Sequence, residues 1–278
     1  MYDIAIVGAG PAGYSAAINA RKRDKSVIIL GRESGWLSRA HSIMNYPGFQ
    51  DITGKELLLK MRNQAINMGS DLCEGTVHQI LPIGDAFSLS IGSDFIDAKR
   101  VIICTGARQP HLLPGEEKLL GRGVSYCGTC DGMFYRGKKV AVLAEGPEAL
   151  SEANFLANIC KEVTWFGVQK EGLDKRIILN NEKPEMITGE EKTTGLLAGG
   201  KYLNFDGIFI FRETTAISTL LPDIVTDDSF IRVNRSMETS ITGVFAAGDC
   251  TGRPLQVAKA VGEGCIAALS AADSLKDL

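Results

Sequence analysis

The feature that most constrains the fold is a glycine-rich turn, GAGPAG at residues 8–13, which directly follows an apolar run at Tyr2–Val7. The next residues fit a helix over 12–23, and Ser26–Leu30 has the aliphatic, β-branched character of a buried strand. The chain therefore opens with a strand–helix–strand unit. This order predicts the α/β class and a doubly wound parallel sheet.

The three glycines of the turn have the spacing of a dinucleotide-binding fingerprint, GxGxxG. Gly8 permits the tight turn, Gly10 lets the backbone approach a pyrophosphate, and Gly13 lets helix and strand pack closely. The helix start adds free N–H groups and a positive dipole end. Its position between a strand and a helix makes this motif a prediction of a dinucleotide site. Glu33, just after the second strand, is expected to accept hydrogen bonds from ribose hydroxyls. The alternative is that it is a glutamate of a surface loop.

A second strand–helix–strand unit is predicted from strands at Lys139–Leu143 and Glu162–Phe166 and a helix at 147–160. We therefore expect two Rossmann-like, three-layer nucleotide-binding domains, the second inserted in the first. Joins near 111–115 and 240–243 assign residues 1–112 and 241–278 to one domain and 113–240 to the other. The remaining expectations are helices at 55–68 and 254–275, antiparallel strands within 72–91, strands at 101–104, 207–211, 230–233 and 244–247, and a poorly patterned polar stretch at 169–200.

Charge and composition exclude several classes of partner. The formal net charge of −3 gives no general attraction to nucleic acid or to an anionic membrane surface. No apolar run approaches the roughly 20 residues that span a bilayer. The start of the chain enters a strand at once and lacks the pattern of a signal peptide, so a cytoplasmic protein is expected.

Two of the seven cysteines are closely spaced, in the sequence Cys127-Gly128-Thr129-Cys130-Asp131. Two intervening residues let the sulfurs meet, so thiol–disulfide exchange is feasible. A zinc site would need a second ligand pair, and neither another CxxC nor a suitable spacing of the three histidines occurs, so no metal is predicted. Asp131 suits a general acid that protonates a departing thiolate, or alternatively caps the following segment. The other five cysteines are expected to be buried small hydrophobes.

With these motifs in order, the chain resembles the low-molecular-weight thioredoxin reductases. The matching blocks are GAGPAG at 8–13, NYPG at 45–48, TGA at 105–107, GRGVSYCGTCDGMFYRGKKVAV at 121–142 and GVFAAGDC at 243–250. The resemblance covers almost the whole chain. It implies FAD in the first domain, the redox pair on the inserted domain, a homodimer, and electron delivery to thioredoxin or a related dithiol protein. It also implies that Cys127 attacks the partner and that Cys130 exchanges with the flavin.

The resemblance also implies which residues surround FAD. Trp36 stands where the family usually has glutamine, which suggests stacking or shielding instead of a polar contact. By position, the cofactor-binding residues are Gly8, Gly10, Pro11, Ala12, Gly13, Gly31, Arg32, Glu33, Trp36, Leu37, Asn45, Val77, Thr105, Gly106, Ala107, Gly248, Asp249, Gln256, Val257 and Ala258.

The second nucleotide fingerprint has eroded. Where GxGxxA would follow the strand, the chain reads AEGPEA at 144–149, so the first glycine is Ala144 and two acids, Glu145 and Glu148, flank the pyrophosphate position. Residues 167–171 contain no arginine for a 2′-phosphate, and the polar stretch that follows looks short. This pattern resembles the ferredoxin-dependent flavin thioredoxin reductases, which implies ferredoxin as electron donor.

Three alternatives stay open from the sequence. A diflavin-linked disulfide oxidoreductase would place a second flavin in the vacated site. A drifted second domain that still binds NAD(P)H would make the enzyme an ordinary thioredoxin reductase. A flavin-bearing redox-sensing module without turnover is the third, against which the intact CxxCD counts.

Overall fold

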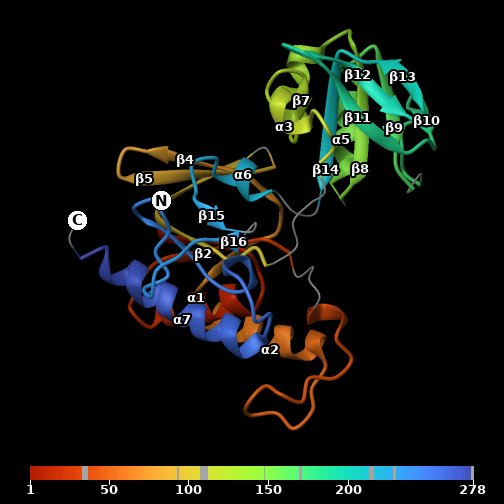
Figure 1. The fold of residues 1–278 in the computed structure, drawn as a ribbon. Helices are drawn as coiled ribbons and strands as arrows, with labels where there is room; N and C mark the ends of the chain where they lie inside the picture. The colour runs from red at the N-terminus through yellow and green to blue at the C-terminus, as the bar shows by residue number, and fades with distance from the viewer. Residues whose placement is uncertain are drawn as a thin grey trace. The chain divides into compact units, whose positions relative to one another are not determined.

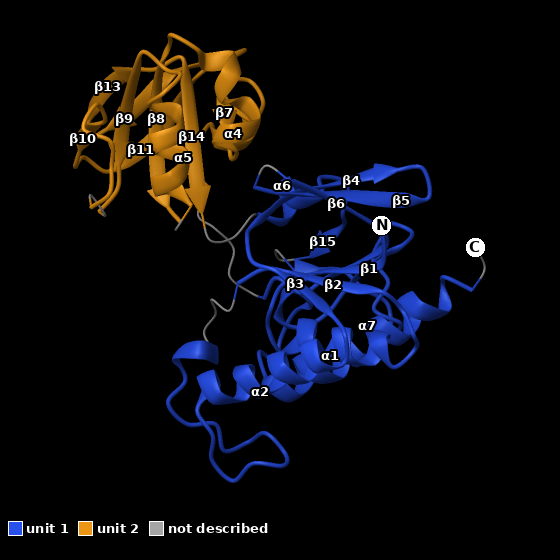
Figure 2. Ribbon diagram, turned by 180° about the vertical axis from the view of Figure 1, so that it is seen from behind, with its two compact units in different colours: residues 1–109, 214–278 blue, residues 110–213 orange. Residues whose placement is uncertain are grey.

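The computed structural model describes residues 1–32, 37–92, 94–106, 112–146, 148–168, 171–212, 216–227 and 230–276. The chain divides into two compact units, Met1–Gln109 with Thr214–Leu278, and Pro110–Glu213 (Figure 2). The predicted class, with parallel Rossmann-like sheets in a mixed α/β chain, is confirmed.

Unit 1 contains one seven-stranded sheet in the order β3-β2-β1-β6-β5-β4, with β17 paired to β6. The strand β6 (Asp94–Ile103) joins two kinds of pairing. Its first half pairs antiparallel with β5, and Val101–Ile103 pairs parallel with β1 and β17. The elements of this unit are β1 (Tyr2–Val7), α1 (Pro11–Arg21), β2 (Val27–Leu30), η1 (Leu37–Arg39), α2 (Gly54–Asn67), β3 (Asp71–Cys73), β4 (Val77–Ile83), β5 (Ala86–Ile91), β6, α6 (Ile217–Leu220), β15 (Thr226–Asp227), β16 (Phe230–Ile231), β17 (Val244–Ala246), η3 (Asp249–Thr251) and α7 (Val257–Asp273).

The alternation of β1 distributes its side chains between two hydrophobic clusters. Ile4 and Ile6 pack toward α1, α2 and α7, which lie together on one side of β1 and β2 (Figure 1). Ala5 and Val7 belong to the cluster that includes residues of β4, β5 and α6. Helices α1 and α7 approach closely because their contact is built from small residues; a side chain at Gly264 would overlap the backbone of Ala12.

The second domain join lies earlier than the sequence predicted, between 213 and 214 instead of near 240. The reason is burial. Ile217, Leu220, Leu221, Ile224 and Ile231 are all buried in the unit 1 cluster. The short elements α6 and β16 therefore stabilise unit 1, although they precede the predicted boundary.

Unit 2 has a parallel five-stranded sheet in the order β10-β9-β8-β14-β7 and an antiparallel sheet, β11-β12-β13. The 169–200 stretch, expected to be poorly patterned, contains three strands, because Leu196 and Ala198 of β12 turn inward and are fully buried with Ile187 of β11. The elements are α3 (Glu116–Leu119), β7 (Val124–Ser125), α4 (Gly128–Asp131), η2 (Gly132–Tyr135), β8 (Lys139–Glu145), α5 (Ala149–Leu156), β9 (Glu162–Phe166), β10 (Ile178–Asn180), β11 (Pro184–Gly189), β12 (Thr193–Ala198), β13 (Lys201–Asn204) and β14 (Gly207–Arg212).

Within the described residues, no helix has both the length and the apolar character needed to cross a bilayer.

Candidate active site and nucleotide sites

The redox pair forms a disulfide at the start of the short helix α4. The Cα atoms of Cys127 and Cys130 lie 5.3 Å apart. Cys127 is extended and precedes the helix, and its Sγ accepts the backbone N–H of Cys130 at 3.1 Å. A side chain at Gly128 would displace the Glu152 carboxylate of α5, which lies directly against this turn. The turn thus places Cys130 on the surface and leaves Cys127 half-buried.

Asp131 is held by a serine that the sequence analysis did not single out. The Oγ of Ser125, which is 3% exposed, donates to Asp131 Oδ2 at 2.7 Å and accepts the N–H of Cys127 at 3.1 Å. Asp131 stands at the N-cap of η2, yet its side chain makes no capping hydrogen bond in the described chain. The capping alternative is therefore not supported. The signal in the sequence was the position of Ser125, two residues before Cys127.

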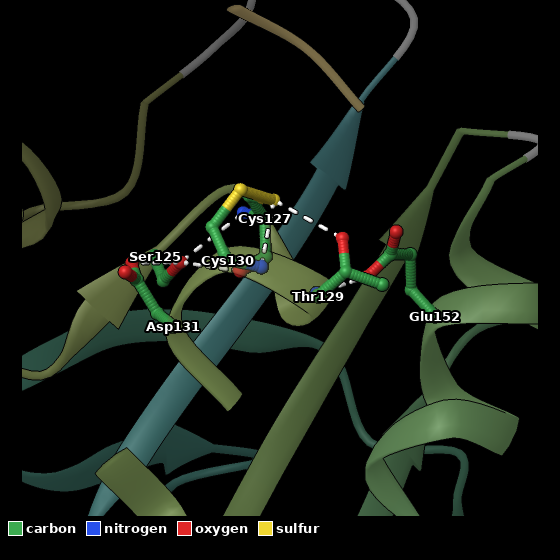
Figure 3. Close-up of a disulfide and its surroundings, with 6 residues drawn as sticks. All are labelled: Ser125, Cys127, Thr129, Cys130, Asp131 and Glu152. Carbon is green, nitrogen blue, oxygen red and sulfur yellow. Dashed lines mark hydrogen bonds between the residues drawn. A yellow bond between two sulfur atoms is a disulfide. The ribbon is translucent and has the colours of Figure 1, made fainter. Parts of the chain in front are cut away.

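A second carboxylate, also missed from the sequence, approaches the disulfide from α5 (Figure 3). Glu152 Oε2 accepts the Thr129 N–H at 2.9 Å, and Thr129 Oγ1 lies 3.4 Å from Cys127 Sγ. Burial raises the pKa of Glu152, and hydrogen bonds from Thr129 and Gly128 only partly offset this effect. Two acidic side chains, Asp131 and Glu152, therefore lie beside the redox turn.

The segment that leads into the redox turn is anchored by a buried ion pair. Glu116 is fully buried, binds the Arg212 guanidinium with both carboxylate oxygens, and accepts the Tyr126 hydroxyl at 2.9 Å. Arg212 lies at the end of β14 and also donates its Nε–H to Glu145 Oε2 at 2.7 Å. The residue before Cys127 is thus tied to the sheet of unit 2.

Arg212 also affects the second nucleotide turn, through its ion pair with Glu145. The two glutamates at 145 and 148 were expected to repel a pyrophosphate, but Glu145 is instead paired with Arg212. A side chain at Gly146 would come within 2.8 Å of the Arg212 backbone. The edge at the end of β8, where a bound dinucleotide would need open backbone, is therefore packed against β14 and carries an internal ion pair.

The first nucleotide turn, in unit 1, has the geometry that the glycine spacing predicts. Gly8 has a φ of +124° and donates its N–H to the Leu30 carbonyl at 2.8 Å. Side chains at Gly8 and Gly13 would overlap the backbone of Cys104 and Gly8, so both positions need glycine for packing. At Gly10, by contrast, a Cβ atom would have no heavy atom of the described residues within 4 Å, its chain neighbours aside. This open side suits the close approach of a phosphate.

Two polar atoms beside this turn are buried without a partner among the described residues, Thr105 Oγ1 and Asp249 Oδ1. Thr105 follows β6 and Asp249 follows β17, and these two strands are paired. Burial raises the pKa of Asp249, although Lys259 opposes the shift. Buried polar atoms of this kind normally bind a ligand or another polar group. The two atoms therefore fit the hydroxyl-rich chain of a bound FAD.

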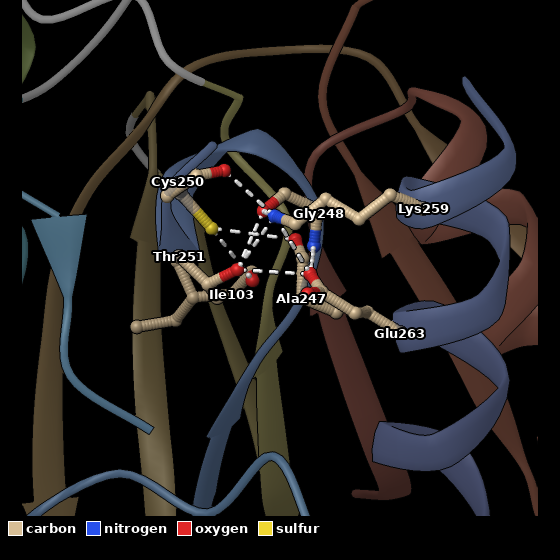
Figure 4. Close-up of polar contacts among 8 residues, drawn as sticks. Ile103, Ala247, Gly248, Cys250, Thr251, Lys259 and Glu263 are labelled. Carbon is tan, nitrogen blue, oxygen red and sulfur yellow. Dashed lines mark hydrogen bonds and ion pairs between the residues drawn. The ribbon is translucent and has the colours of Figure 1, made fainter. Parts of the chain in front are cut away.

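The loop that carries Asp249 is fixed by α7 (Figure 4). Glu263 Oε2 accepts the N–H of Gly248 at 2.9 Å and the hydroxyl of Thr251 at 2.8 Å. Lys259 Nζ donates to the Gly248 carbonyl at 2.9 Å and forms an ion pair with Glu263 at 3.1 Å. The sequence analysis missed Lys259 and Glu263, whose i,i+4 spacing on the predicted helix was the available signal.

The other predicted cofactor residues lie in several places. Asn45 donates its side-chain amide to Gln256 Oε1 at 2.9 Å, which brings two of them together from distant parts of the chain. The Val77 side chain is buried in the cluster on the β4–β5 side. Glu33, Trp36 and Ala107 lie outside the described residues. The rest take these places: Pro11 and Ala12 begin α1, Gly31 and Arg32 follow β2, Leu37 starts η1, Gly106 follows Thr105, and Val257 and Ala258 begin α7 after Gln256.

The five cysteines outside the redox pair differ in burial. Cys104 and Cys250 are buried as expected, whereas Cys73, Cys160 and Cys265 are only partly buried. Across the described ranges, no three histidine, cysteine or acidic side chains come together as metal ligands.

Comparison with known proteins supports the same family along the full chain. The family model of the pyridine nucleotide-disulphide oxidoreductases matches residues 2–264. The thioredoxin reductase of Bacillus subtilis (strain 168) is 32% identical, with 100% of this chain and 96% of that protein covered. That of Mycolicibacterium smegmatis is 35% identical, with coverage of 98% and 96%.

Among solved structures, a ferredoxin-flavin thioredoxin reductase from Clostridium acetobutylicum is similar with a TM-score of 0.89 and 41% identity, covering 100% of this chain and 99% of that one. The sequence motifs, the disulfide turn and these likenesses agree. The chain belongs to the pyridine nucleotide-disulphide oxidoreductase family, and within it to the flavin-dependent disulfide oxidoreductases of the thioredoxin reductase type.

Proposed function

We propose that this protein reduces the disulfide of thioredoxin, or of a related dithiol protein, with electrons that reduced ferredoxin supplies to a bound FAD. The observation that carries the choice of donor is the Arg212–Glu145 ion pair at the end of β8. In a pyridine-nucleotide-dependent enzyme this edge would cradle a pyrophosphate. The proposal includes the assignment of residues 1–109 and 214–278 as the FAD domain, and a cytoplasmic homodimer as the working form.

The FAD assignment is supported by residues that need a ligand. The turn at 8–13 would hold the pyrophosphate. Thr105 Oγ1 and Asp249 Oδ1, which are buried and have no partner among the described residues, would hold polar groups farther along the cofactor. Asn45 and Gln256, already hydrogen-bonded to one another, would lie beside the flavin ring. Bound FAD supplies the conversion of single electrons from a donor into the electron pair that opens a disulfide.

The thiols of Cys127 and Cys130 account for the reduction of the partner disulfide. The Cys127 thiolate attacks one sulfur of the partner disulfide, and the other partner sulfur leaves as a thiolate that takes up a proton. Cys130 then attacks Cys127 in the mixed disulfide, which releases the partner with two thiols and restores the Cys127–Cys130 disulfide. Hydrogen bonds from the Cys130 N–H and the Thr129 hydroxyl to Cys127 Sγ support the choice of Cys127 as nucleophile, since they stabilise its thiolate. Asp131, held by Ser125, is a proton donor or acceptor beside the pair.

Four observations support a donor other than NAD(P)H. The first glycine of the second fingerprint is Ala144, and Glu145 is paired with Arg212. Residues 167–171 carry no arginine for a 2′-phosphate. The similar structure from Clostridium acetobutylicum is that of a ferredoxin-flavin enzyme.

Anaerobic titration of the purified flavoprotein tests the donor. We expect reduced ferredoxin to bleach the flavin absorption and to support thioredoxin reduction, and stoichiometric NADPH or NADH to leave the spectrum unchanged. Full bleaching by NADPH would refute the donor assignment. Flavin content per chain is measured on the same sample, and two flavins per chain would favour the diflavin alternative.

A further inference from the structure

Two charged side chains of α7, Lys259 and Glu263, bind both polar groups of the Gly248 backbone (Figure 4). Glu263 Oε2 accepts the Gly248 N–H at 2.9 Å, and Lys259 Nζ donates to the Gly248 carbonyl at 2.9 Å. The two side chains lie one turn apart and form an ion pair at 3.1 Å, with only 16% and 19% of their surface exposed. Gly248 is therefore held by the helix through both its donor and its acceptor.

The same two side chains also hold the residues that follow Asp249. Lys259 Nζ donates to the Gly252 carbonyl at 2.7 Å. Glu263 Oε2 accepts the Thr251 hydroxyl at 2.8 Å. Asp249 thus lies between two stretches of backbone that α7 fixes.

None of these hydrogen bonds involves the Asp249 side chain. Its Oδ1 is buried and has no partner among the described residues. The backbone turns sharply just before it, because Gly248 has a φ of +88°, a conformation that residues with a side chain rarely adopt. The network therefore sets the direction of the Asp249 carboxyl group and leaves one of its oxygens available to a ligand.

The charges of Lys259 and Glu263 act on Asp249 in opposite directions. Burial raises the pKa of Asp249, Lys259 lowers it, and Glu263 raises it. An effect through charge alone would therefore differ in sign between the two side chains. An effect through the conformation of the loop would have the same sign for both.

We propose that Lys259 and Glu263 are positioning residues for the cofactor, which hold the loop at 248–252 in the conformation in which Asp249 binds a hydroxyl group of FAD. Both act through Asp249, and neither is required to contact the cofactor. With both side chains in place, FAD binding does not have to order the loop. Without either one, ordering of the loop offsets part of the binding free energy. This role deepens the proposed FAD assignment and rests on it.

The test measures the dissociation constant of FAD. The FAD-loaded full chain is diluted, and the fluorescence of the released flavin is followed in single and double variants. Lys259→Met removes the donor to two loop carbonyls, and Glu263→Ala removes the acceptor of the Gly248 N–H. Ferredoxin and thioredoxin are not added, so the result does not depend on the proposed donor or partner.

We expect Lys259→Met and Glu263→Ala each to raise the dissociation constant at least about fivefold, because each removes hydrogen bonds that hold the loop. In an Asp249→Ala background, each substitution should add less than about twofold, since the carboxyl group that the loop directs is then missing. Lys276→Met is the matched control. It removes a cation that is 65% exposed just beyond the same helix, and it should stay within about twofold of the wild type.

Two outcomes would overturn this role while leaving the FAD assignment intact. Opposite effects of Lys259→Met and Glu263→Ala would show that the charges act and the loop conformation does not. Effects that persist in full in the Asp249→Ala background would show that the pair stabilises unit 1 in general. If Asp249→Ala itself leaves the dissociation constant unchanged, the assignment of Asp249 to the cofactor fails, and the positioning role fails with it.

Circular dichroism shows whether each variant is folded. Should a single variant not fold, Lys259→Met is combined with Glu263→Gln, which leaves neither charge of the pair without its partner. This double variant should raise the dissociation constant at least about fivefold and should add less than about twofold to Asp249→Ala. Wild-type affinity in the folded double variant would contradict the proposal.

Discussion

Arg212 and Glu116 form a buried ion pair that joins the end of β14 to the start of α3. Arg212 is 8% exposed and Glu116 is fully buried. The Glu116 carboxylate also accepts the Tyr126 hydroxyl and the Leu113 N–H. The Arg212 guanidinium thus pairs with two carboxylates. One is that of Glu116, next to the redox turn, and the other is that of Glu145, in the eroded nucleotide turn.

Replacing Arg212 by methionine should destabilise unit 2 by about 3–5 kcal/mol, because it leaves the Glu116 carboxylate buried and without its cation. Arg176→Met is the matched control. Arg176 is 58% exposed in its pair with Asp174, so its loss should cost much less than the loss of Arg212. Urea unfolding of both variants measures the difference. Equal stability of the two variants would show that the buried pair is not needed.

The stability of unit 1 should depend on acid through Asp3. Burial raises the pKa of Asp3, but hydrogen bonds from Lys99 and Ser26 outweigh it and bring the pKa to about 2, below the ordinary value of 3.8. The ionised group therefore stabilises the fold above about pH 4, and this contribution is lost as the pH falls toward 2. We expect about 1–2 kcal/mol, since Lys99 is partly exposed.

The measurement is urea unfolding at pH 6, 4 and 2.5 for the wild type and for Asp3→Asn. The variant should be less stable than the wild type at pH 6, and the gap should narrow at pH 2.5. Asp85→Asn, on an exposed turn, is the control and should follow the wild-type curve at all three values. A gap that stays constant with pH would contradict the assignment.

Much of the fold could be predicted because its signals are local. The strand at Tyr2–Val7 and the glycine turn after it are set by residues within a short window, and the strand prediction matches the structure residue for residue. The three strands within 169–200 escaped because their apolar residues do not alternate regularly with polar ones. In β12, for example, the neighbours Gly195 and Leu196 are both buried. The boundary at 213 depends on the burial of Ile217 and Leu220 against distant strands, which no local pattern records.

The residues of the candidate site also divide into those with a local sequence signal and those without one. Cys127, Cys130 and Asp131 are contiguous, so their motif was visible. Glu152 contacts the redox turn only because α5 packs against α4, over a separation of 23 residues from Thr129. Arg212 is 96 residues from Glu116. Side chains brought together over such distances carry no signal in one sequence, because each is an ordinary residue in its own segment.

The glycines at 8 and 10 should respond differently to alanine. Gly8 has a positive φ and no room for a side chain, so Gly8→Ala should prevent unit 1 from folding or strongly destabilise it. Gly10 faces open space, so Gly10→Ala should fold but bind FAD more weakly, because the added methyl group meets the cofactor. Circular dichroism and flavin titration separate the two effects. A Gly10→Ala protein with wild-type FAD affinity would argue that the cofactor lies elsewhere.

The division of labour between the two cysteines can be tested by trapping. Two hydrogen bonds on Cys127 Sγ favour Cys127 as the attacking thiolate, whereas exposure alone would favour Cys130. We expect Cys130→Ser, mixed with oxidised thioredoxin after reduction of the enzyme, to accumulate a mixed disulfide at Cys127 that mass spectrometry detects. Cys127→Ser is the matched variant. Trapping by Cys127→Ser alone would reverse the roles.

Asp249 gives the sharpest test of the cofactor site, because its buried oxygen has no partner among the described residues while its carboxyl pKa is raised by burial. A buried carboxyl oxygen without a hydrogen-bond partner opposes folding of the FAD-free chain. Asp249→Ala should therefore leave the apoprotein as stable as the wild type or more stable, and yet weaken FAD binding at least about tenfold, since a hydrogen bond to a charged group contributes about 1.5–3 kcal/mol. Urea unfolding of the FAD-free protein and flavin titration measure the two quantities. If the substitution destabilises the apoprotein and leaves FAD affinity unchanged, Asp249 serves the fold and the cofactor is held by other groups.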